Sequence, residues 1–207
     1  MTVDAPSAAR RLPSNPFSTR FTRPGSIAPL DPSGQPLDLD ALVDRLPAPG
    51  GCSAITGPHG HGKTSLLVAI LANAGARGRP TTLVRVASPS DAWEVLAMLA
   101  GTAPKTIVGI DGWDRIRFAL MPVLRLVAAY RGASLLVTTH RPGRLPVVAR
   151  CETSRGLLSA IVDRLPDHGG VIDAVDIDDA FSRHRGNVRE ALYDLYDRFE
   201  RRMRSTP

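Results

Sequence analysis

The chain has 207 residues, of which 43% are hydrophobic and 22% charged, and its formal net charge is +6 at pH 7. This composition is typical of a globular protein, and no apolar run approaches the ~18 residues that a membrane-spanning helix requires, which excludes a helical membrane protein. The N-terminal stretch lacks the apolar run of a secretory signal, so we expect a cytoplasmic protein without a membrane partner.

The positive charge raises the question of nucleic-acid binding, because clustered basic residues mark phosphate-binding surfaces. Two of the 26 basic residues are lysines, so 24 are arginines, and they are spread along the chain. In the C-terminal segment, acidic residues precede arginines by four positions, which predicts ion pairs on a solvated helix face. The pairs are Asp194 with Arg198, Asp197 with Arg201, and Glu200 with Arg204. A binding surface for DNA or for a protein stays the alternative.

Three regions follow one another along the chain. Residues 1–36 are rich in proline, serine and glycine without periodicity, so we expect an extended N-terminal arm that is ordered only where it docks. Residues 37–151 are expected to form an α/β domain. Residues 152–207 contain helical segments at 153–165, 176–184 and 188–204, which predicts a small helical subdomain that acts as a lid.

Residues 37–151 alternate between helices and short apolar strands. Strands are predicted at 52–56, 81–87, 105–111, 134–140 and 146–151, and helices at 37–46, 63–76, 91–100 and 115–130, the last broken or kinked at Pro122. Strands that are apolar throughout indicate a mainly parallel sheet covered on both faces, a three-layer α/β/α fold. Ligands of such sheets bind at the carboxyl ends of the strands.

The segment GPHGHGKT, residues 57–64, matches the phosphate-binding pattern GxxxxGK[ST], known as Walker A. It lies between a predicted strand and a predicted helix, where its backbone N–H groups and the helix dipole form a site for anions. Lys63 is expected to reach the β- and γ-phosphates, and the hydroxyl of Thr64 to bind Mg²⁺. The predicted nucleotide-binding residues are Gly57, Pro58, His59, Gly60, His61, Gly62, Lys63, Thr64 and Ser65.

Two further strand ends carry polar side chains. The strand TIVGID ends on Asp111, the position of a Walker B aspartate that holds Mg²⁺. Asp114 follows closely and is a candidate for catalysis or for capping the next helix. The strand SLLVTTH ends on Thr138, Thr139 and His140. We expect Thr139 or His140 to contact the γ-phosphate or the attacking water, with a loop cap as the alternative.

Walker A, Walker B, the polar strand end and the C-terminal helices together resemble the additional-strand P-loop NTPases, and more narrowly the AAA+ group. The stretch HRGNVREAL is similar to the segment that opens the sensor 2 helix of AAA+ lids, and the resemblance implies that Arg189 reaches the γ-phosphate. Asn187 and Glu190 have the spacing of a capping box. The resemblance implies binding of ATP or ADP with Mg²⁺, ATP hydrolysis, and assembly with copies of itself or with a partner protein.

The chain also departs from the AAA+ pattern. AAA+ proteins usually place a water-polarising glutamate directly after the Walker B aspartate, and Gly112 stands at this position. Asp114 is then the nearest candidate for this role. Because loss of nucleophile positioning costs orders of magnitude in rate, we expect slow hydrolysis or a switch. Arg141 and Arg144 lie where the family keeps arginine fingers, although a turn also explains the sequence RPGR.

Three functions stay open: a Mg²⁺-dependent ATPase, a nucleotide-gated module for protein or DNA binding with little turnover, and a small-molecule phosphotransferase. The phosphotransferase would use Arg141, Arg144 and Arg150 over its acceptor.

Two apolar features concern packing. In the arm, Phe17 and Phe21 are expected to cover the edge of the sheet, or, as in related folds, to stack with Arg20 on the base. The last helix carries an apolar stripe that predicts packing against the sheet domain, with a partner surface as the alternative. The stripe consists of Val188, Leu192, Leu195, Tyr196, Phe199 and Met203.

Overall fold

The computed structural model describes residues 15–205, so residues 1–14 of the predicted arm and residues 206–207 lie outside the described part. Five strands form one sheet in the order β2-β3-β4-β1-β5, and every neighbouring pair is parallel. The strands are β1 (Cys52–Thr56), β2 (Thr81–Arg85), β3 (Ile107–Asp111), β4 (Ser134–Thr139) and β5 (Val147–Arg150). The prediction of a parallel α/β sheet is confirmed. Because β4 lies between β1 and β3, its polar end is next to the phosphate-binding loop.

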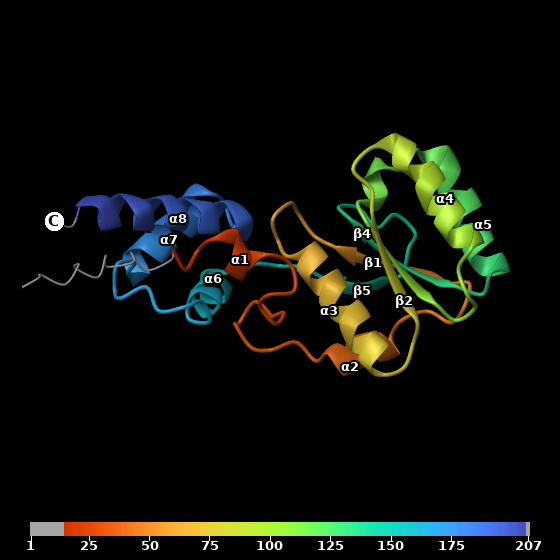
Figure 1. Cartoon of the computed structure of the whole chain (residues 1–207), viewed down its shortest axis with the longest axis horizontal. Coiled ribbons are helices and arrows are strands. Elements are labelled where there is room, and N and C mark those ends of the chain that lie inside the picture. Colours follow the sequence, from red (N-terminus) through yellow and green to blue (C-terminus); the bar gives the residue numbers. More distant parts are fainter. Residues whose placement is uncertain (1–14, 206–207) are drawn as a thin grey trace, which may run out of the picture.

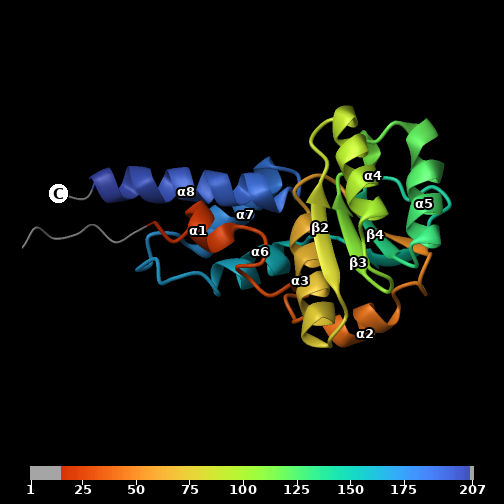
Figure 2. The same cartoon turned by 45° about the vertical axis from the view of Figure 1, so that its right-hand side comes forward.

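Helices cover both faces of the sheet (Figures 1 and 2). One face is packed against α2 (Leu39–Asp44) and α3 (Lys63–Ala76), the other against α4 (Ala92–Ala100) and α5 (Met121–Tyr130). Successive strand residues point to opposite faces: Ile107 belongs to the apolar cluster with α2 and α3, whereas Val108 and Ile110 belong to the cluster with α4 and α5. The strands β1 and β4 are buried along their whole length.

The edge strand β2 corrects the expectation that all strands are apolar and buried. Three of its five residues, Thr82, Leu83 and Arg85, are exposed, and none is fully buried. Leu83 is 43% exposed. The reason is its place in the sheet, since β2 pairs with β3 alone and its outer side has no neighbouring strand.

The segment before α5 also differs from the prediction. Two 3-10 turns, η2 (Trp113–Arg115) and η3 (Phe118–Leu120), occupy the region where a helix was expected, and η1 (Pro89–Asp91) precedes α4. The helix α5 begins at Met121, so Pro122 lies in its first turn. A proline there removes an N–H that has no partner within the helix, and it therefore starts α5 rather than breaking or kinking it.

The C-terminal helices α6 (Arg155–Val162), α7 (Ala174–Arg183) and α8 (Val188–Ser205) form a group beside the sheet (Figure 1). Their apolar core contains Leu158, Ala180, Leu195 and Phe199. The stripe on α8 therefore packs against α6 and α7, and the predicted packing against the sheet domain is wrong. None of the helices in residues 15–205 is long and apolar enough to cross a membrane.

The N-terminal arm is anchored on this helical group. It contains one helical turn, α1 (Thr19–Thr22), and Phe17 just before it is 1% exposed in the helical core, with its ring centroid 6.3 Å from that of Phe199. The amide of Asn15 donates hydrogen bonds to the Tyr196 carbonyl and to Glu200. Phe17 thus neither covers the sheet edge nor can stack on a base, because its ring is buried in the apolar core of the C-terminal helices.

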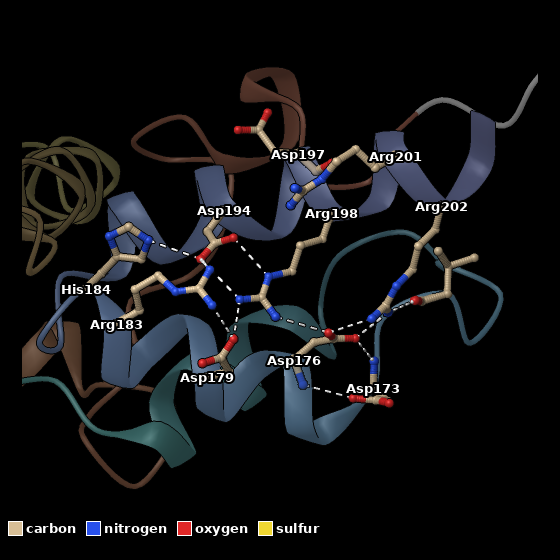
Figure 3. A network of polar contacts seen from close by, with 11 residues as sticks. Asp173, Asp176, Asp179, Arg183, His184, Asp194, Asp197, Arg198, Arg201 and Arg202 are labelled. Atoms are coloured by element: carbon tan, nitrogen blue, oxygen red, sulfur yellow. Dashed lines mark hydrogen bonds and ion pairs between the residues drawn. The ribbon is translucent and has the colours of Figure 1, made fainter. Parts of the chain in front are cut away.

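An ion-pair network joins α7 to α8, as Figure 3 shows. Arg198 contacts Asp194 at 2.9 Å, Asp176 at 3.2 Å and Asp179 at 2.5 Å, and its side chain is only 12% exposed. Burial alone would raise the pKa of Asp176, but hydrogen bonds from Arg202, the Asp173 backbone and Arg198 lower this pKa to about 2.

The predicted solvated face is therefore wrong at Arg198, whose side chain lies largely covered between two helices. The outer pairs are weaker: Arg204 is 3.7 Å from Glu200, and Arg201 donates to the backbone carbonyl of Asp197.

Candidate functional site

The phosphate-binding loop lies between β1 and α3, at the carboxyl edge of the sheet. The helix α3 begins at Lys63, directly after Gly62, which has φ +85°. The first N–H groups of a helix have no partner within the helix and carry its positive dipole end. Together with the turns at the loop glycines, this geometry directs main-chain donors toward the space in front of the loop.

The side chain of Lys63 is folded onto its own loop. Its ammonium donates hydrogen bonds to the carbonyls of Gly57 at 2.6 Å and Pro58 at 2.7 Å. Partial burial lowers the pKa of Lys63, while the carboxylates of Asp111 and Asp114 act in the opposite direction. The ammonium is thereby held at the loop, where a phosphate oxygen can replace a carbonyl as its acceptor.

Thr64 and Asp111 form the candidate metal centre. The Thr64 hydroxyl lies 3.0 and 3.1 Å from the two carboxylate oxygens of Asp111. Hydroxyl and carboxylate oxygens are the ligands that Mg²⁺ takes alongside phosphate oxygens and waters, so these residues fit the ion. Arg85 lies 3.4 Å from Asp111, and Thr138 donates to Asp111 at 2.7 Å. The carboxylate is 15% exposed and fixed from three elements.

Thr138 is a site residue that our choice between Thr139 and His140 missed. Its hydroxyl orients Asp111 and accepts a hydrogen bond from the backbone N–H of Gly112 at 2.9 Å. The sequence did contain a signal for Thr138. Thr138 and Thr139 are adjacent at the end of a strand, so their side chains point to opposite faces of the sheet, and only one of them could be directed toward Thr139's expected partner. Both residues were therefore candidates. Thr138 and His140 line the cavity described below, whereas Thr139 is not among the described residues that line it.

Gly112 cannot be replaced by the expected glutamate without moving the backbone. It has φ +99°, a region that L-residues avoid, and a Cβ atom there would lie 2.6 Å from the Val86 carbonyl oxygen. The Val86 carbonyl is fixed in turn by a hydrogen bond from Arg115 at 3.0 Å. The turn after β3 therefore requires glycine, and any water-activating group comes from another position.

Asp114 is paired with the end of β4. Its carboxylate accepts a short hydrogen bond from the Thr139 hydroxyl, and it accepts the backbone N–H of His140 at 2.6 Å. The oxygen that accepts this N–H, Oδ2, also lies 2.7 Å from His140 Nδ1. Asp114 lies within η2, and its side chain forms no cap there. The two sequence candidates Asp114 and His140 are thus one hydrogen-bonded unit.

His140 in turn contacts the phosphate-binding loop. Its ring centroid is 3.9 Å from that of His59. The electrostatic interaction with His140 is the main cause of a lowered pKa at His59, with smaller contributions from burial, Lys63, Arg115 and Arg189. The charged form of His59 is therefore disfavoured at this position.

The lid contacts the loop from the other side. A Cβ atom at Gly60 would lie 1.7 Å from the side-chain oxygen of Asn187, so the amide of Asn187 sits directly on Gly60. Asn187 also accepts the N–H of Glu190 at 3.2 Å, which is one half of the predicted capping box. Thr153 donates to the Gly186 carbonyl at 2.8 Å and lies 3.4 Å from His61 Nδ1.

A cavity of about 610 Å³ lies where the loop, the strand ends, the lid and the arm meet. Its lining includes Lys63, Thr64, Asp111, His140 and Arg189. Among the described residues that line it is Arg150, but neither Arg141 nor Arg144. This placement gives only one of the three arginines expected over a phosphotransferase acceptor. Arg189 is exposed on the first turn of α8, and its contact with a γ-phosphate stays a prediction.

The predicted site residues therefore come together from separate parts of the chain. The loop residues from Gly57 to Ser65, Asp111, Asp114, His140 and Arg189 surround one cavity or directly contact residues that do. In residues 15–205, no group of three or more histidine, cysteine, aspartate or glutamate residues could hold a metal ion.

No protein-family model matches the sequence, and no curated protein matches it. Solved structures do match the fold. A single-residue mutant of Thermotoga maritima RuvB has a TM-score of 0.54 and 18% identity over 80% of this chain and 66% of that chain. A DNA replication initiation factor has a TM-score of 0.53 and 16% identity over 80% and 62%.

The replication initiator DnaA, in a structure with AMPPCP and single-stranded DNA, has a TM-score of 0.52 and 15% identity over 76% of this chain and 57% of that chain. This chain spans two thirds or less of the length of each of these three chains. At these identities the matches establish a common fold: the chain has the AAA+-like P-loop fold.

Proposed function

Starting from the AAA+-like P-loop fold, we propose that this protein binds ATP with Mg²⁺ in the cavity at the carboxyl edge of its sheet and hydrolyses it slowly. The observation that carries the proposal is the constellation of Lys63, Thr64 and Asp111: an ammonium at the loop, and a hydroxyl within 3.1 Å of a carboxylate on the neighbouring element. In P-loop proteins these three groups hold the phosphates and the metal.

Each residue has a role that follows from its place. Lys63 and the loop amides neutralise the charge of the β- and γ-phosphates, and Thr64 and Asp111 are the protein ligands of Mg²⁺. The metal, when bound, neutralises charge that develops on the phosphate oxygens. Arg189, at the start of α8, adds a positive charge from the lid, so lid position depends on which nucleotide is bound.

The same geometry supports low turnover. A glutamate after Asp111 is excluded by the φ of Gly112 and by the Val86 carbonyl, while the groups that grip phosphate and metal are all present. A protein that binds the phosphates and the metal tightly but activates the attacking water weakly keeps ATP bound for a long time before hydrolysis.

A second candidate, a nucleotide-gated interaction module with negligible turnover, is favoured by the direct contact of the lid with the loop at Gly60 and Asn187. Its partner would be another copy, a protein or DNA. Size-exclusion chromatography with light scattering, with and without Mg·ATP, separates a nucleotide-dependent assembly from a monomeric ATPase. DNA retention that falls steeply with salt would identify DNA as the partner.

Titration of the purified chain with Mg·ATP tests the binding site itself. Lys63→Ala is expected to abolish measurable binding in calorimetry, because the phosphates lose their main positive side chain, while the thermal unfolding transition stays in place. Lys105→Ala is the matched control, since Lys105 is the other lysine of the chain and is exposed. Retained affinity in Lys63→Ala would refute the site.

A further inference from the structure

The turn after β3 leaves the chain without a carboxylate at the usual water-activating position. A replacement must reach the cavity, be accessible to water, and offer a lone pair that no other donor occupies. Asp114 meets the third condition poorly, because its carboxylate already accepts three hydrogen bonds, one from Thr139 and two from His140.

His140 meets all three conditions. Asp114 lies 2.7 Å from its Nδ1, and a carboxylate accepts but cannot donate, so Nδ1 carries the proton in the neutral ring. This tautomer leaves a free lone pair on Nε2. The side chain is 35% exposed, which admits water, and it lines the same cavity as Lys63 and Asp111.

Two neighbours hold the His140 ring in place. His59 lies against it from the phosphate-binding loop, at 3.9 Å between centroids. Asp114 faces the ring from η2, with its carboxylate 2.7 Å from Nδ1.

We infer that His140, positioned by Asp114, takes the place of the missing glutamate as the general base for ATP hydrolysis. The inference rests on the proposed function. A water oxygen forms a bond to the γ-phosphorus while the bond from that phosphorus to the β,γ-bridging oxygen breaks. Nε2 takes a proton of the water, and ADP leaves with the electron pair of the broken bond. Asp114 is a positioning residue: it fixes the tautomer and stabilises the imidazolium.

Two measurements on the full chain test this inference. Single-turnover phosphate release is followed with enzyme in excess over Mg·ATP, and Mg·ATP affinity is measured in the same samples. His140→Gln and Asp114→Asn are expected to slow release about 100-fold or more, the usual contribution of a general base, with affinity changed less than about threefold. His184→Gln, a histidine paired with Asp194 away from the cavity, is the matched control and is expected to keep the wild-type rate.

The second measurement does not depend on activity or on any variant. Long-range ¹H–¹⁵N NMR of the wild-type protein without nucleotide is expected to show His140 as the tautomer protonated on Nδ1. A ring protonated on Nε2 would overturn the inference.

The outcomes also separate this inference from the proposed function. If the wild type fails to bind Mg·ATP, the proposed function fails and the inference with it. If it binds and hydrolyses ATP but His140→Gln keeps the wild-type rate, the inference alone is overturned. If it binds ATP but releases no phosphate, the inference is overturned and the nucleotide-gated module stands.

Discussion

Asn187 and Gly60 are in direct contact, since a Cβ atom at Gly60 would lie 1.7 Å from the side-chain oxygen of Asn187. The two residues belong to the lid and to the phosphate-binding loop, and they are far apart in sequence. We therefore expect a movement of the loop on nucleotide binding to displace the N-terminal end of α8.

This contact predicts a non-additive pair of substitutions. Gly60→Ala is expected to destabilise the protein, because the new Cβ meets Asn187 and because φ is +73°, which costs an L-residue about 1–2 kcal/mol. Asn187→Ala removes the side-chain amide that the new Cβ would meet, but it also removes the hydrogen bond by which Asn187 caps α8. The double variant is therefore expected to be more stable than the sum of the single effects by about 1 kcal/mol or more in urea unfolding. Additive effects would mean that the lid does not rest on the loop.

Gly112 gives a prediction about the turn after β3. Gly112→Ala is expected to destabilise the protein more than Gly78→Ala, although both positions have positive φ, because only Gly112 faces a carbonyl, Val86 O, at 2.6 Å. Gly78 has open space and isolates the conformational cost of about 1–2 kcal/mol. The collision adds about 1–3 kcal/mol.

The same position also tests the reason for low turnover. Gly112→Glu is expected not to raise the rate of phosphate release, since the turn must distort to hold any side chain. Equal destabilisation of Gly112→Ala and Gly78→Ala, or faster hydrolysis in Gly112→Glu, would contradict this account of the turn.

Thr64 gives a prediction about the metal. In wild type, ATP is expected to bind more tightly with Mg²⁺ than with EDTA, because the ion bridges phosphate oxygens to Thr64 and Asp111. Thr64→Val keeps the shape of the side chain and removes the hydroxyl, so the gain in affinity from Mg²⁺ is expected to fall about tenfold or more. Affinity in EDTA serves as the internal control and should change less than about twofold. An unchanged Mg²⁺ effect would remove Thr64 from the metal centre.

The ion-pair network predicts the acid stability of the lid. The pKa of Asp176 is about 2 in the folded chain against 3.8 ordinarily, so its charged form stabilises the fold above about pH 4. This stabilisation, about 2 kcal/mol by linkage, is lost as pH falls from about 4 through 2. Asp176→Asn is expected to remove that part of the pH dependence.

Unfolding by urea at a series of pH values measures the effect. At neutral pH, Asp176→Asn is also expected to cost about 3 kcal/mol, since it removes the buried carboxylate that Arg198 and Arg202 share. Asp197→Asn, on the exposed side of α8, is the matched control and should keep the wild-type profile. If the free energy of unfolding of Asp176→Asn depends on pH as in the wild type, Asp176 is not the source of the acid sensitivity.

The sequence by itself determined the class of fold and the central part of the candidate site. Local patterns carry this information: apolar strands alternating with helices, a glycine-rich loop before a helix, and aspartate at a strand end. Such patterns depend on neighbouring residues, so the strand and helix positions, the parallel sheet and the place of Lys63, Thr64 and Asp111 could be read from the chain.

Only the tertiary structure decided what depends on contacts between distant segments. In the folded chain Phe17 lies in the helical core, Arg198 lies between two helices instead of in solvent, and Thr138 orients Asp111. The tertiary structure also joined Asp114 to His140 and set Asn187 on Gly60. No local spacing encodes these pairs, because the order of the strands and the docking of α8 bring residues together that the chain keeps apart.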